Sequence, residues 1–274
     1  TPIKSSAASD VYKRQMQMMS RAGFHLSAKN NNGVVTAEFV GCGMPKKNKL
    51  KSTVDWGTAS SANGLQDIED AVVAASNEGV TIRYVVMHVA DFSLLKKQKS
   101  TFDTLKAWVN STTKLVVTKK LINEYLAEQE IPVQIVTVNP AVRIENASHQ
   151  RKTINPWQRK RVCFLEDLKV GDIQHGPIAA ESSEALRKIA LMVKQDWILI
   201  TKWSELEPYK EWTKAEANAI PVVNDPDAMY IMKVDGAEWP EDEDTEGTDN
   251  VPASFLGENV DPEDHTAIDT ENGE

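Results

Sequence analysis

The stretch from residue 64 to residue 139 constrains the fold most, because helical and extended hydrophobic spacing alternate along it. Apolar residues recur at helical intervals over residues 65–75, and an almost unbroken apolar run follows at residues 84–89. Such a run is typical of a strand that is covered on both faces. Two more helical segments and a second strand at residues 133–138 complete the pattern. The order helix, strand, helix, helix, strand predicts a compact α/β unit.

Polar residues mark the ends of these helices. Asn63 precedes the first helix, and three acids in the next turn would lie at the positive end of its dipole. Asn77 and Gly79 are typical of a helix end. Asp91 is the predicted cap of the second helix, which is expected to continue to residue 105, and Thr118 is the predicted cap of the third.

The length and composition allow a large core. A chain of 274 residues with 41% hydrophobic content can build one large or two modest domains. No apolar run is long enough to span a bilayer and no N-terminal signal is visible, so no membrane partner is expected. Cys42 and Cys163 do not form a motif, which favours two reduced thiols over a disulfide or a metal pair.

Charge is divided unevenly along the chain. The net charge is −9, but residues 236–274 contain 14 of the 40 acids and none of the 31 lysines and arginines. The rest of the chain therefore has 31 basic residues against 26 acids, an excess of five positive charges. Apolar residues are sparse in the acidic segment, so it cannot bury enough surface to offset its ordering entropy. We expect a mildly basic body and an acidic, disordered tail.

The first residues are considered separately. Residues 5–15 resemble the translation of sequencing-adapter DNA, so we exclude residues 1–15 from fold reasoning and expect the true start of the gene to be missing. Residues 16–26 are predicted to be the last turns of a longer helix. A turn at residues 30–33 and a strand at residues 34–40 are predicted to follow.

The second half of the chain has weaker patterns. Short strands are predicted at residues 162–165, 197–203 and 228–234, and a loop at residues 168–176. Residues 182–192 have spacing that fits either a helix or a strand at residues 189–193, and the pattern leaves both open.

Two groups of basic residues stand out. The lysine-rich loop at residues 46–51 could contact nucleic acid, and a second basic cluster, interleaved with Trp157, lies at residues 151–161. A solvated basic loop is the favoured interpretation of the first group.

No pattern of residues predicts catalysis. The chain has neither a phosphate-binding loop nor a nucleophile elbow. The histidines stand apart, with no zinc-ligand spacing: His25, His88, His149, His175 and His265. His88 is the most plausible general base, but a hydrogen-bonded core histidine is the favoured interpretation. We therefore predict no enzyme, no catalytic, cofactor-binding or metal residues, and no cofactor.

Several segments together resemble a known family. Residues 67–139, 155–165 and 171–177 are similar to the second half of tailed-phage major capsid proteins, in particular the lambda-like major head protein family, family E. Residues 219–228 resemble the closing segment of that family. The similarity covers about residues 16–235, and the family's N-terminal arm, extended hairpin loop and most of its long spine helix have no counterpart here. By this resemblance the chain is an N-terminally truncated member with an additional acidic extension.

The resemblance implies an α+β fold of the Hong Kong 97 type, with an axial α/β domain and a peripheral domain that contains a spine helix and a narrow antiparallel sheet. Residues 16–63 would hold the end of the spine helix and a peripheral strand, and residues 64–180 the axial domain. Residues 181–235 would return to the peripheral domain, and residues 236–274 would be the acidic tail. Residues 155–175 would supply the axial contacts at the centre of each capsomer.

The function that the resemblance implies is structural. Copies would self-assemble into pentamers and hexamers of an icosahedral head that encloses double-stranded DNA, with scaffolding, decoration and portal proteins as further partners. The protein would reside in the virion, and in the host cytoplasm during assembly. The alternatives are another phage structural protein of the tail or baseplate, or an α/β enzyme or ligand-binding domain of unknown chemistry. The acidic tail is expected to avoid packaged DNA, and to project outward or contact a basic partner.

Overall fold

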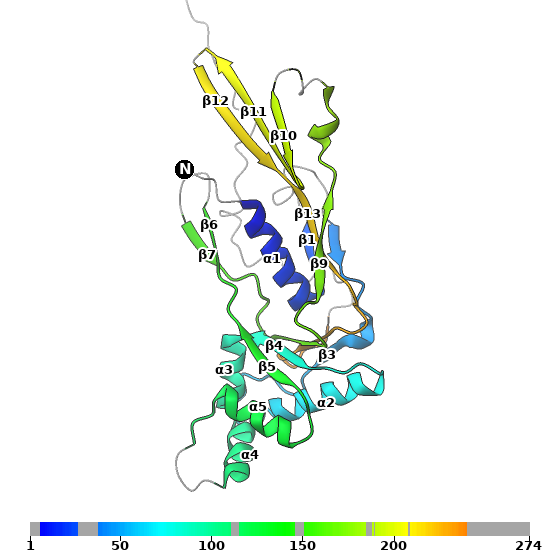
Figure 1. Cartoon of the computed structure of the whole chain (residues 1–274). Helices are drawn as coiled ribbons and strands as arrows, with labels where there is room; N and C mark the ends of the chain where they lie inside the picture. Colours follow the sequence, from blue (N-terminus) through cyan, green and yellow to red (C-terminus); the bar gives the residue numbers. More distant parts are fainter. Residues whose placement is uncertain are drawn as a thin grey trace, which may run out of the picture.

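The protein is elongated, with an α/β lobe at one end and a narrow arm of strands at the other (Figure 1). The computed structural model describes residues 6–26, 38–110, 115–145, 151–184, 188, 190–207 and 209–239. The helices are α1 (Ser6–Arg21), α2 (Gly64–Asn77), α3 (Val89–Lys97), α4 (Lys99–Val109) and α5 (Lys119–Glu128), with 3-10 turns η1 (Lys46–Asn48) and η2 (Ala179–Ser182). The strands are β1 (Gly23–Leu26), β2 (Glu38–Gly41), β3 (Lys49–Lys51), β4 (Tyr84–His88), β5 (Gln134–Val138), β6 (Val142–Glu145), β7 (Arg151–Ile154), β8 (Arg161–Leu165), β9 (Gly171–Gly176), β10 (Leu191–Gln195), β11 (Ile198–Leu206), β12 (Tyr209–Glu216), β13 (Asn218–Val223) and β14 (Tyr230–Lys233).

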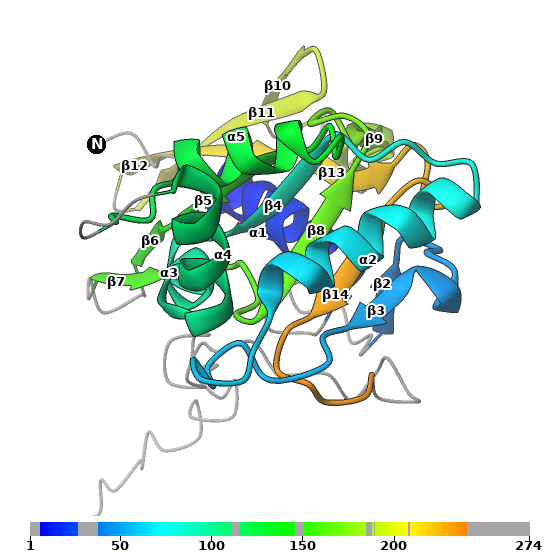
Figure 2. The same ribbon diagram turned by 90° about the horizontal axis from the view of Figure 1, so that it is seen from below.

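A mixed five-stranded sheet in the order β3-β14-β8-β4-β5 organises the lobe. The outer pairs β3–β14 and β4–β5 are parallel, whereas β8 is antiparallel to both of its neighbours. Helices α2 and α5 cover one face of this sheet, and α1 lies behind the other face (Figure 2). The predicted α/β unit is therefore present, although its sheet is mixed.

The central strands divide their side chains between two hydrophobic clusters. In β8, Val162 and Phe164 pack in the cluster beneath α2 and α5, whereas Cys163 and Leu165 pack in the cluster on the α1 side. Strand β4 does the same, with Val85 on the first side and Val86 on the second. Because successive side chains of a strand point to opposite faces, a continuous apolar run fills both clusters. The prediction of a strand that is covered on both faces is confirmed.

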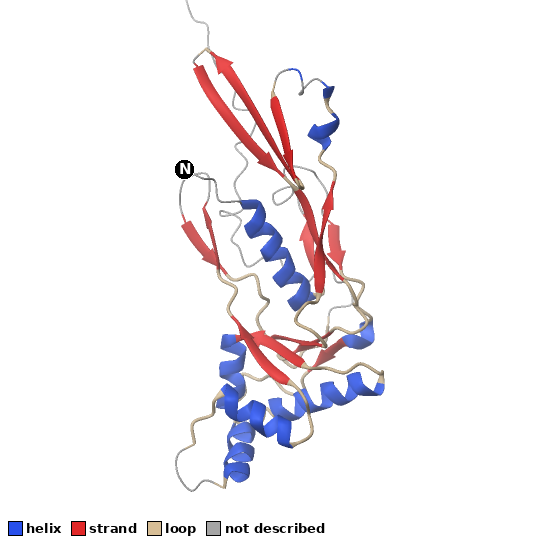
Figure 3. Ribbon diagram, viewed as in Figure 1, coloured by secondary structure: helices blue, strands red, loops and turns tan. Residues whose placement is uncertain are grey.

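The arm consists of antiparallel strands with the 3-10 turn η2, helices α2 to α5 gather in the lobe, and α1 lies between these two parts (Figure 3). Strands β9 and β13 form one antiparallel pair that lies against α1, and β10, β11 and β12 form a three-stranded sheet beyond it. The pairs β1–β2 and β6–β7 flank α1. None of the described helices has the length and apolarity that crossing a bilayer requires.

Several predicted helix ends are confirmed. The Thr118 hydroxyl accepts a hydrogen bond from the Leu121 amide, as expected of a cap. Helix α2 ends at Asn77, and Gly79 adopts a positive φ of 82°. Asn63 is at the cap position of α2, but its side chain makes no capping hydrogen bond. The Gln98 side-chain oxygen instead accepts from the Gly64 amide at 2.7 Å.

Other local predictions were wrong. Helix α3 begins at Val89, where a strand residue was predicted, and its cap is His88 rather than Asp91. It also ends before Gln98, so the single helix expected to residue 105 is two helices, α3 and α4. Each error has a tertiary cause, because the side chains of both Asp91 and Gln98 bind distant backbone.

The structure also differs from the prediction in the N-terminal region and in the arm. The longer helix expected before residue 26 is present as α1, which includes Ser6–Gln15, but it ends at Arg21 and β1 follows. Residues 171–176 form β9 instead of the predicted loop, because β13 supplies a partner. The strand that was left open at residues 189–193 is present as β10, which begins later, at Leu191, and ends at Gln195. The predicted turn at residues 30–33, and the predicted strand before residue 38, lie outside the described residues.

The sheet pairing does not follow the predicted domain limits. Strands β3 and β14, assigned to the peripheral domain by sequence, are hydrogen-bonded in the same sheet as β4 and β8. Strand β9, assigned to the axial domain, pairs with β13 of the arm. Two strands that are far apart in sequence, β3 and β14, therefore complete the lobe sheet.

Candidate functional site

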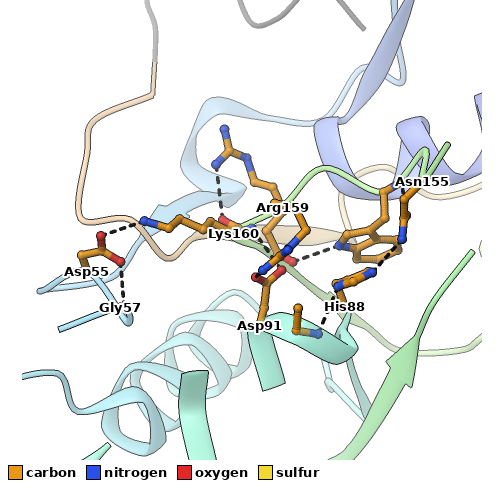
Figure 4. Close-up of polar contacts among 10 residues, drawn as sticks. Asp55, Gly57, His88, Asp91, Asn155, Arg159 and Lys160 are labelled. Atoms are coloured by element: carbon orange, nitrogen blue, oxygen red, sulfur yellow. Dashed lines mark hydrogen bonds and ion pairs between the residues drawn. The ribbon is translucent and has the colours of Figure 1, made fainter. Parts of the chain in front are cut away.

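The most connected polar group surrounds the turn at residues 155–161, between β7 and β8 (Figure 4). The Arg159 guanidinium donates through Nε and Nη2 to Asp91 Oδ1, at 3.1 and 2.9 Å. The Lys160 amide donates to the other carboxylate oxygen of Asp91 at 3.0 Å. The Asp91 side chain is fully buried, while that of Arg159 is 48% exposed. Asp91 therefore anchors this turn instead of capping its own helix.

A second ion pair holds the same turn to the loop before α2. Lys160 Nζ lies 2.7 Å from Asp55 Oδ2, and Asp55 Oδ1 accepts from the Gly57 amide at 2.8 Å. The hydrogen bond from Lys160 holds the pKa of Asp55 below its usual value, against the opposing effect of partial burial. Lys160 has a positive φ of 58°, which for a non-glycine residue is uncommon. These contacts stabilise the backbone conformation that aims both basic side chains at carboxylates.

His88 is a structural residue of this network. Its Nδ1 accepts from the Ala90 amide at 3.1 Å, and the Asn155 side-chain nitrogen lies 2.7 Å from its Nε2. The Asn155 oxygen accepts from the Trp157 amide, and the Trp157 indole donates to the Arg161 carbonyl at 3.2 Å. The interpretation of His88 as a buried, hydrogen-bonded histidine is confirmed.

The turn also connects the lobe to α1. The Gln158 amide donates to the Ser20 hydroxyl at 3.0 Å, and Arg21 donates through Nε and Nη2 to the Gln158 side-chain oxygen at 3.0 and 2.7 Å. The 155–161 turn thus contacts α1, α3 and the loop before α2, which places it at the junction between the lobe and the rest of the molecule.

The structure assigns different roles to the predicted basic groups. Arg159 and Lys160 are in ion pairs, and the Arg161 guanidinium lies 4.8 Å from the centre of the Trp239 ring. These side chains are therefore engaged within the chain. In the lysine-rich loop, Lys47 pairs with Glu78 at 2.5 Å.

The start of the acidic tail is attached to the lobe. The Trp239 indole donates to the Leu50 carbonyl of β3 at 2.6 Å, and Lys49 Nζ lies 5.6 Å from the centre of its ring. Glu238 pairs with Lys51 and accepts from Lys233. The predicted disorder is therefore wrong for Gly236–Trp239, while residues 240–274 lie outside the described part of the chain.

The cysteines and the possible metal ligands are further reactive groups among the described residues. Burial raises the pKa of the free thiols of Cys42 and Cys163, which keeps them protonated and weakly nucleophilic. Among the described residues, no group of three His, Cys, Asp or Glu side chains could hold a metal ion. His88 and Arg159, which the sequence singled out, hydrogen-bond within the network around the 155–161 turn.

The arm carries an exposed apolar surface that sequence reasoning missed. Five large side chains share one face of the β10-β11-β12 sheet and are exposed, which we call the arm surface: Leu191, Val193, Ile198, Leu206 and Tyr209. Leu206 is 82% exposed, Tyr209 66% and Leu191 64%. They form two groups on this face, Leu206 with Tyr209 at one end and the other three at the opposite end, with polar residues between them: Lys202, Ser204, Glu211 and Thr213. Exposed apolar side chains that gather on one face of a protein commonly mark a contact with another protein. The alternation of Lys, Glu and aromatic residues in β12 was the available signal.

The predicted capsomer-contact segment, residues 155–175, is only partly available to a neighbour. It includes β8, which lies in the middle of the sheet and is buried at every residue. Strand β9, by contrast, is exposed over most of its length. Because β8 is buried, it cannot form such contacts.

Comparison with solved structures supports the predicted fold. The putative capsid protein of a prophage from E. coli CFT073 has a TM-score of 0.52 and 14% sequence identity, over 82% of this chain and 62% of that one. A phage-related protein from Bordetella bronchiseptica RB50 has 14% identity and a TM-score of 0.38, over 71% of this chain and 59% of that one. This chain thus spans about three fifths of either length, and the first likeness confirms the mixed α+β capsid fold.

Sequence comparison decides the family. No curated protein matches the chain. The family model described as phage major capsid protein E matches residues 14–234, which includes α1 from its ninth residue, the whole lobe and the arm. The predicted resemblance is confirmed, and the role that this family supports is structural. The chain belongs to the phage major capsid protein E family.

Proposed function

We propose that this chain is a structural, non-enzymatic subunit of an icosahedral bacteriophage head, which self-assembles into pentamers and hexamers around the DNA genome. The observation that carries the proposal is the arm surface. A lone soluble subunit gains nothing from exposing five large apolar side chains on one sheet face. Burying them between copies would stabilise the assembly by about 25 cal/mol for each Å² of apolar surface removed from water.

The elongated shape of the molecule suits a shell subunit that contacts its neighbours at both ends. The lobe has a hydrophobic core of its own, including β3 and β14, and would form the axial domain at the centre of a capsomer. The arm and α1 would form the peripheral domain, where neighbouring capsomers meet. The 155–161 turn, which contacts the lobe and α1, would keep the two parts in one orientation. A defined angle between them matters because the copies in a closed shell must make similar contacts with their neighbours.

Electron microscopy of the purified chain, alone and co-expressed with a candidate scaffolding protein, tests the proposal. We expect capsomers or closed shells. Replacing Leu206 on the arm surface with lysine should reduce assembly, while the matched change Val73→Lys, on an exposed site of α2, should reduce it less. A monomer at every concentration, and in particular one that turns over a small metabolite, would refute the proposal.

Further partners follow from the same role. Scaffolding, decoration and portal proteins, and packaged double-stranded DNA on the inner face, are the proposed partners, with the virion as the location and the host cytoplasm as the site of assembly. The acidic tail is attached to the lobe through Trp239, whose indole donates to the Leu50 carbonyl, and we propose that the rest of the tail points away from the DNA because both are negatively charged. Protease treatment of DNA-filled particles tests this: removal of the tail is expected, and protection of the tail would contradict it.

A further inference from the structure

Strand β12 is an edge strand that lies open along its length. Among the described residues it pairs with β11 and with no other strand. Its residues from Tyr209 to Ala215 are all exposed, and Glu216 is half-buried. An open edge strand presents a row of backbone N–H and C=O groups that can pair with another chain. Charged side chains alone do not prevent this when their order matches that of the partner.

We propose that β12 pairs antiparallel with β12 of a second copy of this chain, across a two-fold axis that passes beside Thr213. The two β10-β11-β12 sheets would then form one continuous sheet through both copies. This inference rests on the proposed function, since it names one of the contacts by which subunits assemble. A two-fold contact of this kind is isologous, so a single strand must be complementary to itself.

The order of charges in β12 has this self-complementarity. With the axis at Thr213, Lys210 lies opposite Glu216 of the second copy, and the symmetry makes this pair twice. Trp212 lies opposite Lys214 of the second copy, also twice, which places an ammonium beside a partly exposed indole. Cross-strand pairs of opposite charge stabilise a sheet.

The two remaining pairings in this register bring no like charges together. Glu211 lies opposite Ala215 of the second copy, so no like charges face each other directly. Thr213 lies opposite itself, and threonine pairs are favourable across antiparallel strands.

Other symmetric registers place like charges together. An axis at Trp212 sets Lys210 opposite Lys214 of the second copy, and axes at Lys210, Glu211 or Lys214 set each of these residues opposite itself. Like charges directly opposite each other destabilise a sheet. Axes nearer either end of β12 leave few residues paired. Thr213 is therefore the axis that the sequence of the strand favours.

The rest of the arm supports the strand in this position. Trp212 stacks on Trp203 of β11, with ring centres 6.3 Å apart, and Lys214 forms an ion pair with Glu216 at 2.6 Å on the same face. These contacts hold the side chains of one face in place before a second copy arrives. A pre-ordered edge loses less conformational entropy on pairing than a mobile one.

Disulfide formation in the full chain tests the register. Directly opposite residues of antiparallel strands have Cα atoms about 4.5–5.5 Å apart, within the range that a disulfide requires. Thr213→Cys should therefore cross-link with its own copy. Glu211→Cys is the matched control, because two copies of residue 211 would be four positions apart, about 13 Å. An equimolar mixture of Glu211→Cys and Ala215→Cys chains should cross-link to each other.

The parent protein serves as the blank, since Cys163 is buried and Cys42 is half-buried. On non-reducing gels, we expect the Thr213→Cys dimer to form at least roughly tenfold faster than the Glu211→Cys dimer, with the mixture as fast as Thr213→Cys. In the Thr213→Cys background, Lys210→Glu should slow cross-linking, and adding Glu216→Lys should restore it.

The outcomes separate this inference from the proposed function. If the chain forms shells or capsomers but Thr213→Cys cross-links no faster than Glu211→Cys, the β12 contact is refuted and the role in the shell stands. If the chain stays monomeric at every concentration and no variant cross-links, both fail. Circular dichroism of each variant verifies that its fold is intact.

Discussion

Replacing Asp91 with alanine removes the acceptor that holds the 155–161 turn against α3. Asp91 is fully buried and accepts three hydrogen bonds, two from the Arg159 guanidinium and one from the Lys160 amide. Removing one partner of a buried ion pair costs about 3–5 kcal/mol. Because Arg159 is half-exposed, water can solvate it in the variant, so we expect a loss of about 3 kcal/mol, mostly from the unpaired Lys160 amide and the cavity.

Thermal or urea unfolding of the soluble subunit measures this loss. For a chain of this size, about 3 kcal/mol lowers Tm by roughly 6–12 °C. Asp103→Ala is the matched control, since Asp103 is an exposed carboxylate on α4, and it should change stability by less than about 0.5 kcal/mol. Arg159→Ala should cost at least as much as Asp91→Ala, because it leaves a buried carboxylate with one hydrogen bond, and the double variant should cost less than the sum. A loss below about 1 kcal/mol for Asp91→Ala would refute the reasoning.

Three further predictions concern single sites. Gly64→Ala should destabilise the chain by about 1–3 kcal/mol in urea unfolding, because its Cβ would lie 2.5 Å from a methyl carbon of the buried Leu95, and unchanged stability would contradict this. Thr118→Ala should cost about 1 kcal/mol by losing a capping hydrogen bond, whereas Asn63→Ala, whose side chain caps nothing, should cost under about 0.5 kcal/mol in the same assay. The folded pKa of Asp55 is lowered, so its contribution is present above the unfolded pKa of about 3.9 and is lost as pH falls through the folded value. Asp55→Asn should therefore lower Tm at neutral pH by an amount worth under about 1 kcal/mol and make less difference near pH 2, and a difference that grows in acid would be inconsistent with the ion pair.

Strands with a continuous apolar run could be predicted from sequence. Strands β4, β5, β8 and β14 lie where the apolar pattern placed them, because filling two hydrophobic clusters requires apolar side chains on both faces. The cap at Thr118 could also be predicted, since it depends on residues within one helical turn.

Strands whose partner is distant could not be predicted. Strand β9 is exposed and polar, and it is a strand because β13, more than 40 residues later, pairs with it. Strand β12 has charged residues on both faces, which resembles a loop until β11 is beside it. Local pattern carries no information about such partners.

The polar network shows the same limit. An acid at the start of a helix is an ordinary cap by local rules, and Asp91 was predicted to be one. The structure instead pairs it with Arg159, 68 residues away in sequence. Trp239 is a single aromatic residue in an acidic segment, and its place beside Lys49 and Arg161 depends on the packing of β3 at the edge of the lobe sheet.

Strand β12 has a consequence for how the chain can polymerise. It lies at one edge of the three-stranded sheet, and all but one of its residues are exposed. A subunit whose sheets were open at every edge could add copies without end and grow into ribbons. In the proposed pairing one symmetric mate occupies the whole β12 edge, so strand addition there ends after a single step, which leaves growth to contacts that can close into a finite particle.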